Sequence, residues 1–187
     1  MEVITINGQK RENTGTTAAT AVRNSGKIPC IMYGGANAVS FSADPKEVRK
    51  LVYTPKFRTV DLKLDGKSHK CILKDIQFHP TTDAVLHLDF LELVPGKKVK
   101  AVVPITFTGS SIGVKNGGKF IASLRSVKVL TTPEKMLDEV VADISALDLG
   151  QTIRVRDIKL QDGVQIINAG AIPIAAIEIP RALRGKK

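Results

Sequence analysis

Cysteine is scarce in this sequence: Cys30 and Cys71 are the only two among 187 residues. This is too few for the disulfide framework of a small secreted domain and fits a reducing cytosol. Apolar residues flank both, so we expect buried thiols. The sequence also lacks a run of about 18 apolar residues, and its N-terminus has no basic region followed by an apolar segment. We therefore expect a soluble cytoplasmic protein that is not exported and does not span a membrane.

Signatures of common catalytic sites are absent as well. The sequence has no Gly-x-Ser-x-Gly motif, and Gly113–Lys119 does not complete the phosphate-loop pattern GxxxxGK[ST]. His79, His87 and Asp89 could form a metal site with two histidines and one carboxylate. However, no HExxH spacing, general base or cysteine ligand accompanies them. We expect no enzymatic activity, no metal and no cofactor, and we interpret Gly113–Lys119 as a loop between strands.

Acidic residues are missing from residues 13–43, which contain no Asp or Glu. This stretch holds Arg23, Lys27 and Tyr33 among many small residues, which allow a polyanion to approach the backbone. The formal net charge of +10 and the isoelectric point near 9.7 also indicate an acidic partner. These residues alone do not distinguish RNA from membrane lipid or a heparin-like polymer.

A break in composition at Val94-Pro95-Gly96-Lys97-Lys98 predicts two domains, residues 1–94 and 95–187, with net charges of +3 and +7. The last seven residues contain four of the basic side chains: Arg181, Arg184, Lys186 and Lys187. They form either a solubilising tail or a segment that becomes ordered on binding.

The sequence of the first domain predicts a β-rich unit with one or two helices. Alternating apolar residues around Asp65-Gly66 predict a hairpin, and Asn7-Gly8 predicts a turn after a first strand. Further strands are expected at 28–33, 39–42, 76–78 and 86–90, and helices at 16–25 and 45–53, the second capped by Asp44.

In the second domain, short strands alternate with turn signals. They are expected at 99–107, 126–130, 139–143, 152–155, 164–167 and 174–179, with a glycine-rich loop at 109–118. This pattern predicts an all-β domain.

His87 and Asp89 lie two residues apart on a predicted strand, so they share a face while Leu88 and Phe90 point toward the core. A carboxylate on a surface that meets a polyanion is repelled unless it reads a base edge or orients a cationic neighbour. The alternative is that both side chains belong to the solvated face of an edge strand.

A longer pattern connects these segments. It consists of Arg11, Gly15, Arg23, Gly26-Lys27-Ile28-Pro29, Tyr33-Gly34, Phe78-His79-Pro80 and His87-Leu88-Asp89-Phe90-Leu91-Glu92. In order and spacing it resembles the bacterial large-subunit ribosomal protein L-twenty-five family across residues 1–94. The β-rich second half resembles the long, two-domain form of that family, also called the CTC or general stress protein type.

The resemblance implies a mainly β (α+β) fold, with a six-stranded, barrel-like N-terminal domain carrying one or two helices and a β-rich C-terminal domain. It also implies a structural role in the large ribosomal subunit, with binding to 5S rRNA at the central protuberance. Neighbouring ribosomal proteins and rRNA are expected as further partners, and the free protein is expected to be a monomer. The expected RNA contacts are Arg11, Arg23, Lys27, Tyr33, Gln77, His87 and Asp89. The alternative is a stress-induced RNA-binding factor that visits the ribosome.

Two positions depart from the family pattern. Members commonly carry Lys and a second basic residue where this chain has Thr16 and Thr20. Two lost positive charges are expected to weaken phosphate contacts, unless Lys10 or the second domain compensates.

Overall fold

The computed structural model describes residues 2–180, so the basic residues at 181–187 lie outside the described part. The chain divides into two compact units between Lys97 and Lys98, just beyond the expected boundary at Val94 and Pro95. Backbone N–H of Lys97 donates to the carbonyl of Val94 at 3.2 Å, with Gly96 at a φ of 76° in this turn. None of the described helices is long and apolar enough to span a membrane.

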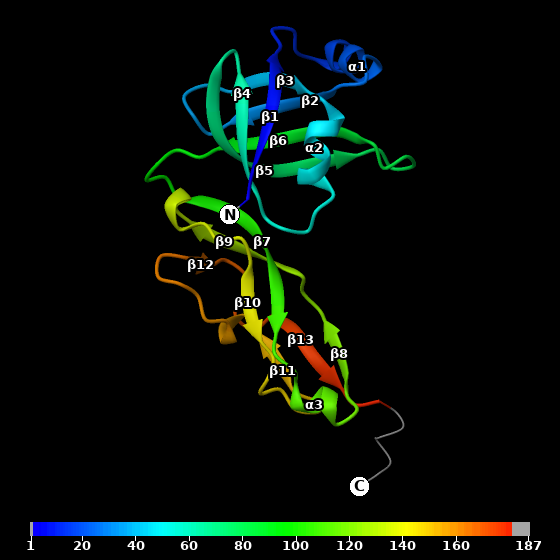
Figure 1. Ribbon diagram of the computed structural model, residues 1–187, viewed down its shortest axis with the longest axis vertical. Coiled ribbons are helices and arrows are strands. Elements are labelled where there is room, and N and C mark those ends of the chain that lie inside the picture. Colours follow the sequence, from blue (N-terminus) through cyan, green and yellow to red (C-terminus); the bar gives the residue numbers. More distant parts are fainter. Residues whose placement is uncertain (1, 181–187) are drawn as a thin grey trace. The chain divides into compact units, whose positions relative to one another are not determined.

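Within the described part of the first unit, six strands close into a barrel in the order β1-β3-β2-β6-β5-β4 (Figure 1). The strands are β1 Val3–Lys10, β2 Ile28–Tyr33, β3 Val39–Ala43, β4 Thr59–Leu64, β5 Lys67–Phe78 and β6 Val85–Glu92. Two parallel pairs, β1 with β4 and β2 with β6, combine with antiparallel pairs to complete the circle. The mainly β fold and the barrel predicted for this half are therefore confirmed.

The hairpin between β4 and β5 forms where the sequence predicts it. Asp65 and Gly66 have φ angles of 48° and 80°, and Leu64 pairs with Lys67 across the turn. Positive φ at both central positions matches the turn whose twist suits a two-residue hairpin loop. Alternate residues Val60, Leu62 and Leu64 are buried, so this hairpin contributes one wall of the core.

The predicted turn at Asn7-Gly8 is wrong, because β1 runs through both residues to Lys10. A Cβ on Gly8 would lie 2.6 Å from a Leu64 side-chain atom and 2.7 Å from the Phe41 ring. Glycine at this position leaves room for core side chains and does not turn the chain. The backbone N–H of Asn7 donates to the Glu47 carboxylate at 2.7 Å, which ties the strand to a helix.

Two helices accompany the barrel, α1 Thr16–Asn24 and α2 Pro45–Val52. Helix α2 is capped as expected, since the Asp44 carboxylate accepts from the N–H of Lys46 at 2.8 Å. It buries Val48 and Leu51 in the core. Helix α1 differs: it has no side-chain cap and no buried residue, so its attachment is looser.

The barrel core is apolar and contains both thiols. Phe41 and Phe90 are fully buried with ring centroids 5.6 Å apart, and Cys30 and Cys71 are inaccessible to solvent. Burial raises the pKa of each thiol to about 12, so both stay protonated. The expectation that the cysteines are core residues is confirmed.

The described part of the second unit contains two sheets, ordered β10-β7-β9-β12 and β11-β13-β8. Their strands are β7 Val99–Thr108, β8 Lys119–Ala122, β9 Ser126–Thr131, β10 Val140–Asp143, β11 Thr152–Arg154, β12 Gln165–Ile166 and β13 Pro173–Glu178. The unit is β-rich, and Phe107 and Phe120 meet edge to face with ring centroids 5.1 Å apart. Val127, Val129 and Ile174 are fully buried in it.

Three details of this unit differ from the prediction. Strand β8 was not expected, because its four residues show little alternation. The loop expected at 109–118 contains a short helix, α3 Ile112–Lys115, capped by the Ser111 hydroxyl. Two 3₁₀ turns, at Pro133–Lys135 and Val155–Asp157, also interrupt the all-β pattern.

Candidate nucleic-acid interface

The outer face of β2 and β6 carries three of the seven residues that the sequence singled out: Tyr33, His87 and Asp89. Register pairs Ile31 with Asp89, and the alternating residues Cys30, Met32, Leu88 and Phe90 are buried inside. Because side chains alternate along a strand, His87 and Asp89 point outward on β6. The predicted orientation of this strand is confirmed.

Strand β5 extends this face through a β-bulge. Leu73 pairs with Phe90 and Asp75 with Asp89, so one extra residue separates the two pairs on β5. The bulge reverses the alternation and turns Asp75 outward beside Asp89. It also sets Gln77 opposite His87, which makes them cross-strand neighbours. Asp75 did not emerge from the sequence, because regular alternation from Cys71 points it toward the core.

His87 and Asp89 are in contact on this face. The distance from Nδ1 of His87 to Oδ1 of Asp89 is 2.8 Å, and their side chains are 24% and 31% exposed. This contact is compatible with the carboxylate orienting a neighbouring ring. With Nδ1 engaged, the other ring nitrogen of His87 is left for a ligand.

Tyr33 lies at the end of β2, outward by the same alternation. Burial, followed by the charges of Asp89 and Asp75, raises the pKa of its hydroxyl above the ordinary value. The hydroxyl is therefore protonated at neutral pH and can donate a hydrogen bond to a phosphate or base oxygen.

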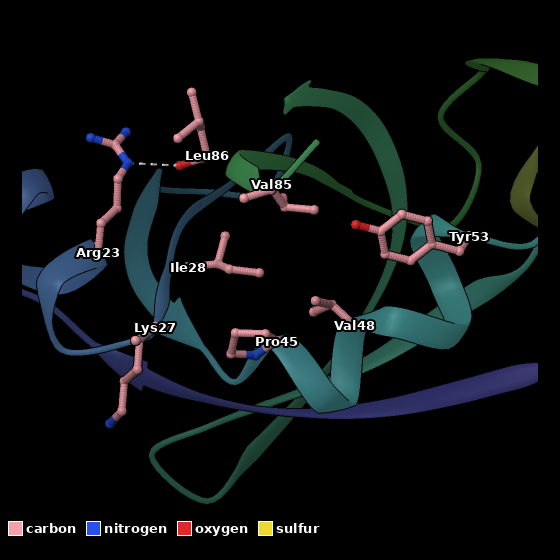
Figure 2. Close-up of a pocket in the computed structure, with 10 residues that line it drawn as sticks. Arg23, Lys27, Ile28, Pro45, Val48, Tyr53, Val85 and Leu86 are labelled. Carbon is pink, nitrogen blue, oxygen red and sulfur yellow. Dashed lines mark hydrogen bonds between the residues drawn. The ribbon is translucent and has the colours of Figure 1, made fainter. Parts of the chain in front are cut away.

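Arg23 is tied to β6 although it belongs to α1. Its Nε donates to the carbonyl of Leu86 at 3.1 Å, immediately before His87 in sequence (Figure 2). The other two guanidinium nitrogens have no hydrogen-bond partner among residues 2–180. Arg23 is thus oriented by the fold while part of its guanidinium stays available.

Lys27 and Arg11 are held in other ways. Nζ of Lys27 donates to the side-chain oxygen of Gln9 at 2.6 Å. Nε of Arg11 donates to the carbonyl of Phe41 at 3.2 Å, and one of its terminal nitrogens is buried without a partner within the described residues. Arg11 therefore anchors the segment that follows β1 onto strand β3. This contact gives Arg11 a structural role in addition to any contact with a ligand.

The two threonines that replace family basic residues lie on α1. The Thr20 hydroxyl donates to the carbonyl of Thr16 at 2.9 Å, so it is satisfied within its own helix. Helix α1 thus presents Arg23 near its end with neutral side chains at these two positions.

The metal hypothesis for His79, His87 and Asp89 receives no geometric support. Nδ1 of His79 lies 3.1 Å from the Thr81 hydroxyl in its own loop, and Asp89 is engaged with His87. Within residues 2–180, no group of three or more His, Cys, Asp or Glu side chains is arranged to hold an ion.

Comparison with known proteins covers both units. The Ribosomal L25p family matches residues 6–90, and the family described as Ribosomal protein TL5, C-terminal domain, matches residues 98–181. Relatives named "Large ribosomal subunit protein bL25" occur in Cytophaga hutchinsonii, 37% identical over 98% of this chain and 95% of the relative, and in Phocaeicola vulgatus, 38% identical over 99% and 96%. The relative in Christiangramia forsetii is 43% identical over 88% of this chain and 76% of its own.

The first unit is a closed barrel with a polar outer face, and a second β-rich unit follows it. Together with both family matches, this architecture defines a two-domain ribosomal protein. The chain belongs to the Ribosomal L25p family, in the form that carries the additional C-terminal domain. The family resemblance inferred from the sequence is confirmed.

Proposed function

We propose that this protein is a non-enzymatic structural component of the large ribosomal subunit, and that residues 1–94 bind 5S rRNA. The names of its relatives support the ribosomal role, since they cover nearly the whole chain. In this proposal the protein works in the cytoplasm, as part of the ribosome. Neighbouring ribosomal proteins and rRNA are its further partners.

The observation that carries the proposal is the outer face of β2, β6 and β5. It combines a hydroxyl donor on Tyr33, the paired His87 and Asp89, and Gln77 opposite His87. Arg23 adds a guanidinium anchored beside this face. Arginine and lysine meet phosphates, while hydroxyl, amide, imidazole and carboxylate groups can read base edges. Arg11 and Lys27 complete the proposed set of contacts.

Asp89 provides the sharpest test because its charge opposes binding to a polyanion. We expect Asp89→Ala to weaken 5S rRNA binding by about tenfold although the protein becomes more positive, since loss of one buried or oriented polar contact costs about 1–3 kcal/mol. Filter binding at fixed salt measures this. Asp65→Asn at the exposed hairpin tip makes the same change in charge and suits the positive φ of this position, so it is the matched control. Binding that is tighter for Asp89→Ala than for wild type would remove Asp89 from the site.

A stress-induced factor that only visits the ribosome remains the rival hypothesis. Quantifying the chain in large subunits washed at high salt separates the two. Near-equal stoichiometry with other subunit proteins is expected from a structural component. Substoichiometric amounts that rise under stress would instead favour the rival.

A further inference from the structure

An apolar cavity of about 330 Å³ opens where β2 and β6 begin. Ile28, Val48 and Val85 face it, with Pro45 on the same side as Val48 (Figure 2). Ile28 and Val48 are themselves core residues, 4% and 1% exposed. The cavity is therefore floored by the rigid barrel and not by a loop, and its volume falls in the range of small-ligand sites.

Aromatic rings stand at one side of this cavity. Tyr53 is 60% exposed, and its ring centroid lies 6.4 Å from that of Phe78, which is 43% exposed. Figure 2 shows the Tyr53 hydroxyl directed toward the cavity, and it donates to the carbonyl of Asp83 at 3.3 Å. An exposed aromatic pair beside an apolar hollow is a surface on which a planar group can stack.

A cation stands at the opposite side. Arg23 lines the cavity, and its bond to the carbonyl of Leu86 leaves two guanidinium nitrogens without a partner among the described residues (Figure 2). Lys27 is also a lining residue, although Figure 2 shows its amine directed away from the opening. No acidic side chain lines this cavity within residues 2–180. The site thus favours a ligand with a planar, weakly polar part and a neighbouring negative charge.

We propose that this cavity takes one unstacked base of the bound RNA, with the Tyr53 ring as its stacking surface and Arg23 at the adjacent phosphate. The inference rests on the proposed RNA-binding function, and it adds a specific subsite to it. A nucleotide matches the charge pattern, whereas an apolar side chain of a neighbouring protein leaves the free guanidinium of Arg23 unused. RNA recognition commonly uses bases that are splayed out of loops and stacked on aromatic rings.

The test uses the full chain and 5S rRNA, with two matched pairs of variants. Tyr53→Ala removes the ring and Tyr53→Phe keeps it. Ala84→Glu places a carboxylate at the cavity lining, and Thr82→Glu adds the same charge in the same exposed loop, outside the lining. All three positions are solvent-exposed, so the four variants are expected to fold, and circular dichroism checks this. Filter binding measures affinity, and chemical probing of base edges maps the RNA.

We expect Tyr53→Ala to weaken binding by roughly 5- to 100-fold, the range for loss of one base–aromatic stack, and Tyr53→Phe to change it little. Ala84→Glu should weaken binding more than Thr82→Glu. One nucleotide should lose its protection with Tyr53→Ala while the rest of the footprint remains.

Three results overturn the inference and are distinguishable. In the first, wild type prefers 5S rRNA over an unrelated RNA of equal length, but the two variants within each pair bind equally well and the footprint is unchanged. The cavity then holds no base, and the proposed function stands. If wild type shows no such preference, the proposed function fails and the inference with it. Reduced incorporation of Tyr53→Ala into large subunits with unchanged RNA binding assigns the cavity to a neighbouring protein and likewise contradicts the inference.

Discussion

The two units of this protein differ in how their net charge relates to the placement of the candidate site. The sequence of the second half carries the larger net charge, +7 for residues 95–187 against +3 for residues 1–94. Yet the oriented groups Arg23, His87 and Asp89 belong to the first unit. The comparison teaches that net charge indicates a class of partner, whereas a site requires side chains held in place by the backbone.

The two units also differ in the architecture of their sheets. The barrel joins its strands into a circle, which leaves no unpaired edge within the described part of the first unit. The described part of the second unit has two open sheets, whose outer strands include the short β12 and β11. A closed barrel gives a rigid base for a precise surface, and the following predictions examine that contrast.

The largest effect is expected in the barrel core. Phe90→Ala should reduce the free energy of unfolding by about 3–5 kcal/mol, because it removes a fully buried ring that packs on Phe41. Residue-resolved hydrogen exchange under denaturant measures the loss at amides of β6 and of β9. If the amides of Val127 and Val129 are destabilised as much as those of the barrel, the two units do not unfold separately. Val3→Ala, at a largely exposed position of β1, is the control.

Alkaline pH should destabilise the barrel alone. Burial raises the pKa of Cys30 and Cys71 to about 12 in the folded state, above the ordinary value of 9.0. This stabilisation is complete below pH 9 and is lost as pH rises toward 12, at about 1 kcal/mol per thiol one pH unit above the unfolded pKa. Hydrogen exchange between pH 8 and 10 measures it. A double variant, Cys30→Ala with Cys71→Ala, should lose this pH dependence, and an unchanged slope would contradict the assignment.

A smaller effect concerns the salt dependence of RNA binding. Arg23→Ala should lower the slope of log K against log[salt] by about 0.7 to 0.9 if the guanidinium meets one phosphate. Arg125→Ala removes an exposed arginine from the second unit and should leave the slope for 5S rRNA unchanged. Equal changes for both variants would mean that binding follows overall charge and not the barrel face.

The smallest effect is expected in the second unit at acidic pH. Hydrogen bonds from the Ser145 hydroxyl at 2.6 Å and from its backbone N–H at 2.9 Å hold the pKa of Asp143 below its ordinary value. Because the pKa of this carboxyl is lower in the folded state than in the unfolded state, the carboxylate stabilises the unit at pH values above the unfolded pKa. This contribution is lost as pH falls through the folded pKa. Asp143→Asn should therefore flatten the acid side of the stability profile slightly. The exposed Asp162→Asn should not, and if it flattens the profile equally, the Ser145 contacts are not responsible.

Much of the first unit could be predicted from the sequence because its signals are local. Alternation around Asp65-Gly66, the Asp44 cap before Pro45, and the inward Leu88 and Phe90 all depend on neighbours along the chain. The turn expected at Asn7-Gly8 failed because a glycine that admits core side chains looks the same in sequence as a turn glycine. Strand β8 was missed because four residues with weak alternation carry little signal.

The sequence by itself determined the β-rich composition of both halves, the buried thiols, the outward position of His87 and Asp89, and the family. Only the tertiary structure decided the order in which the six strands join around the barrel, the bulge in β5 that brings Asp75 and Gln77 to one face, and the anchoring of Arg23 to Leu86. The reason is physical. Alternation and caps act over a few residues, whereas register shifts and contacts between residues 63 positions apart depend on how the whole barrel packs.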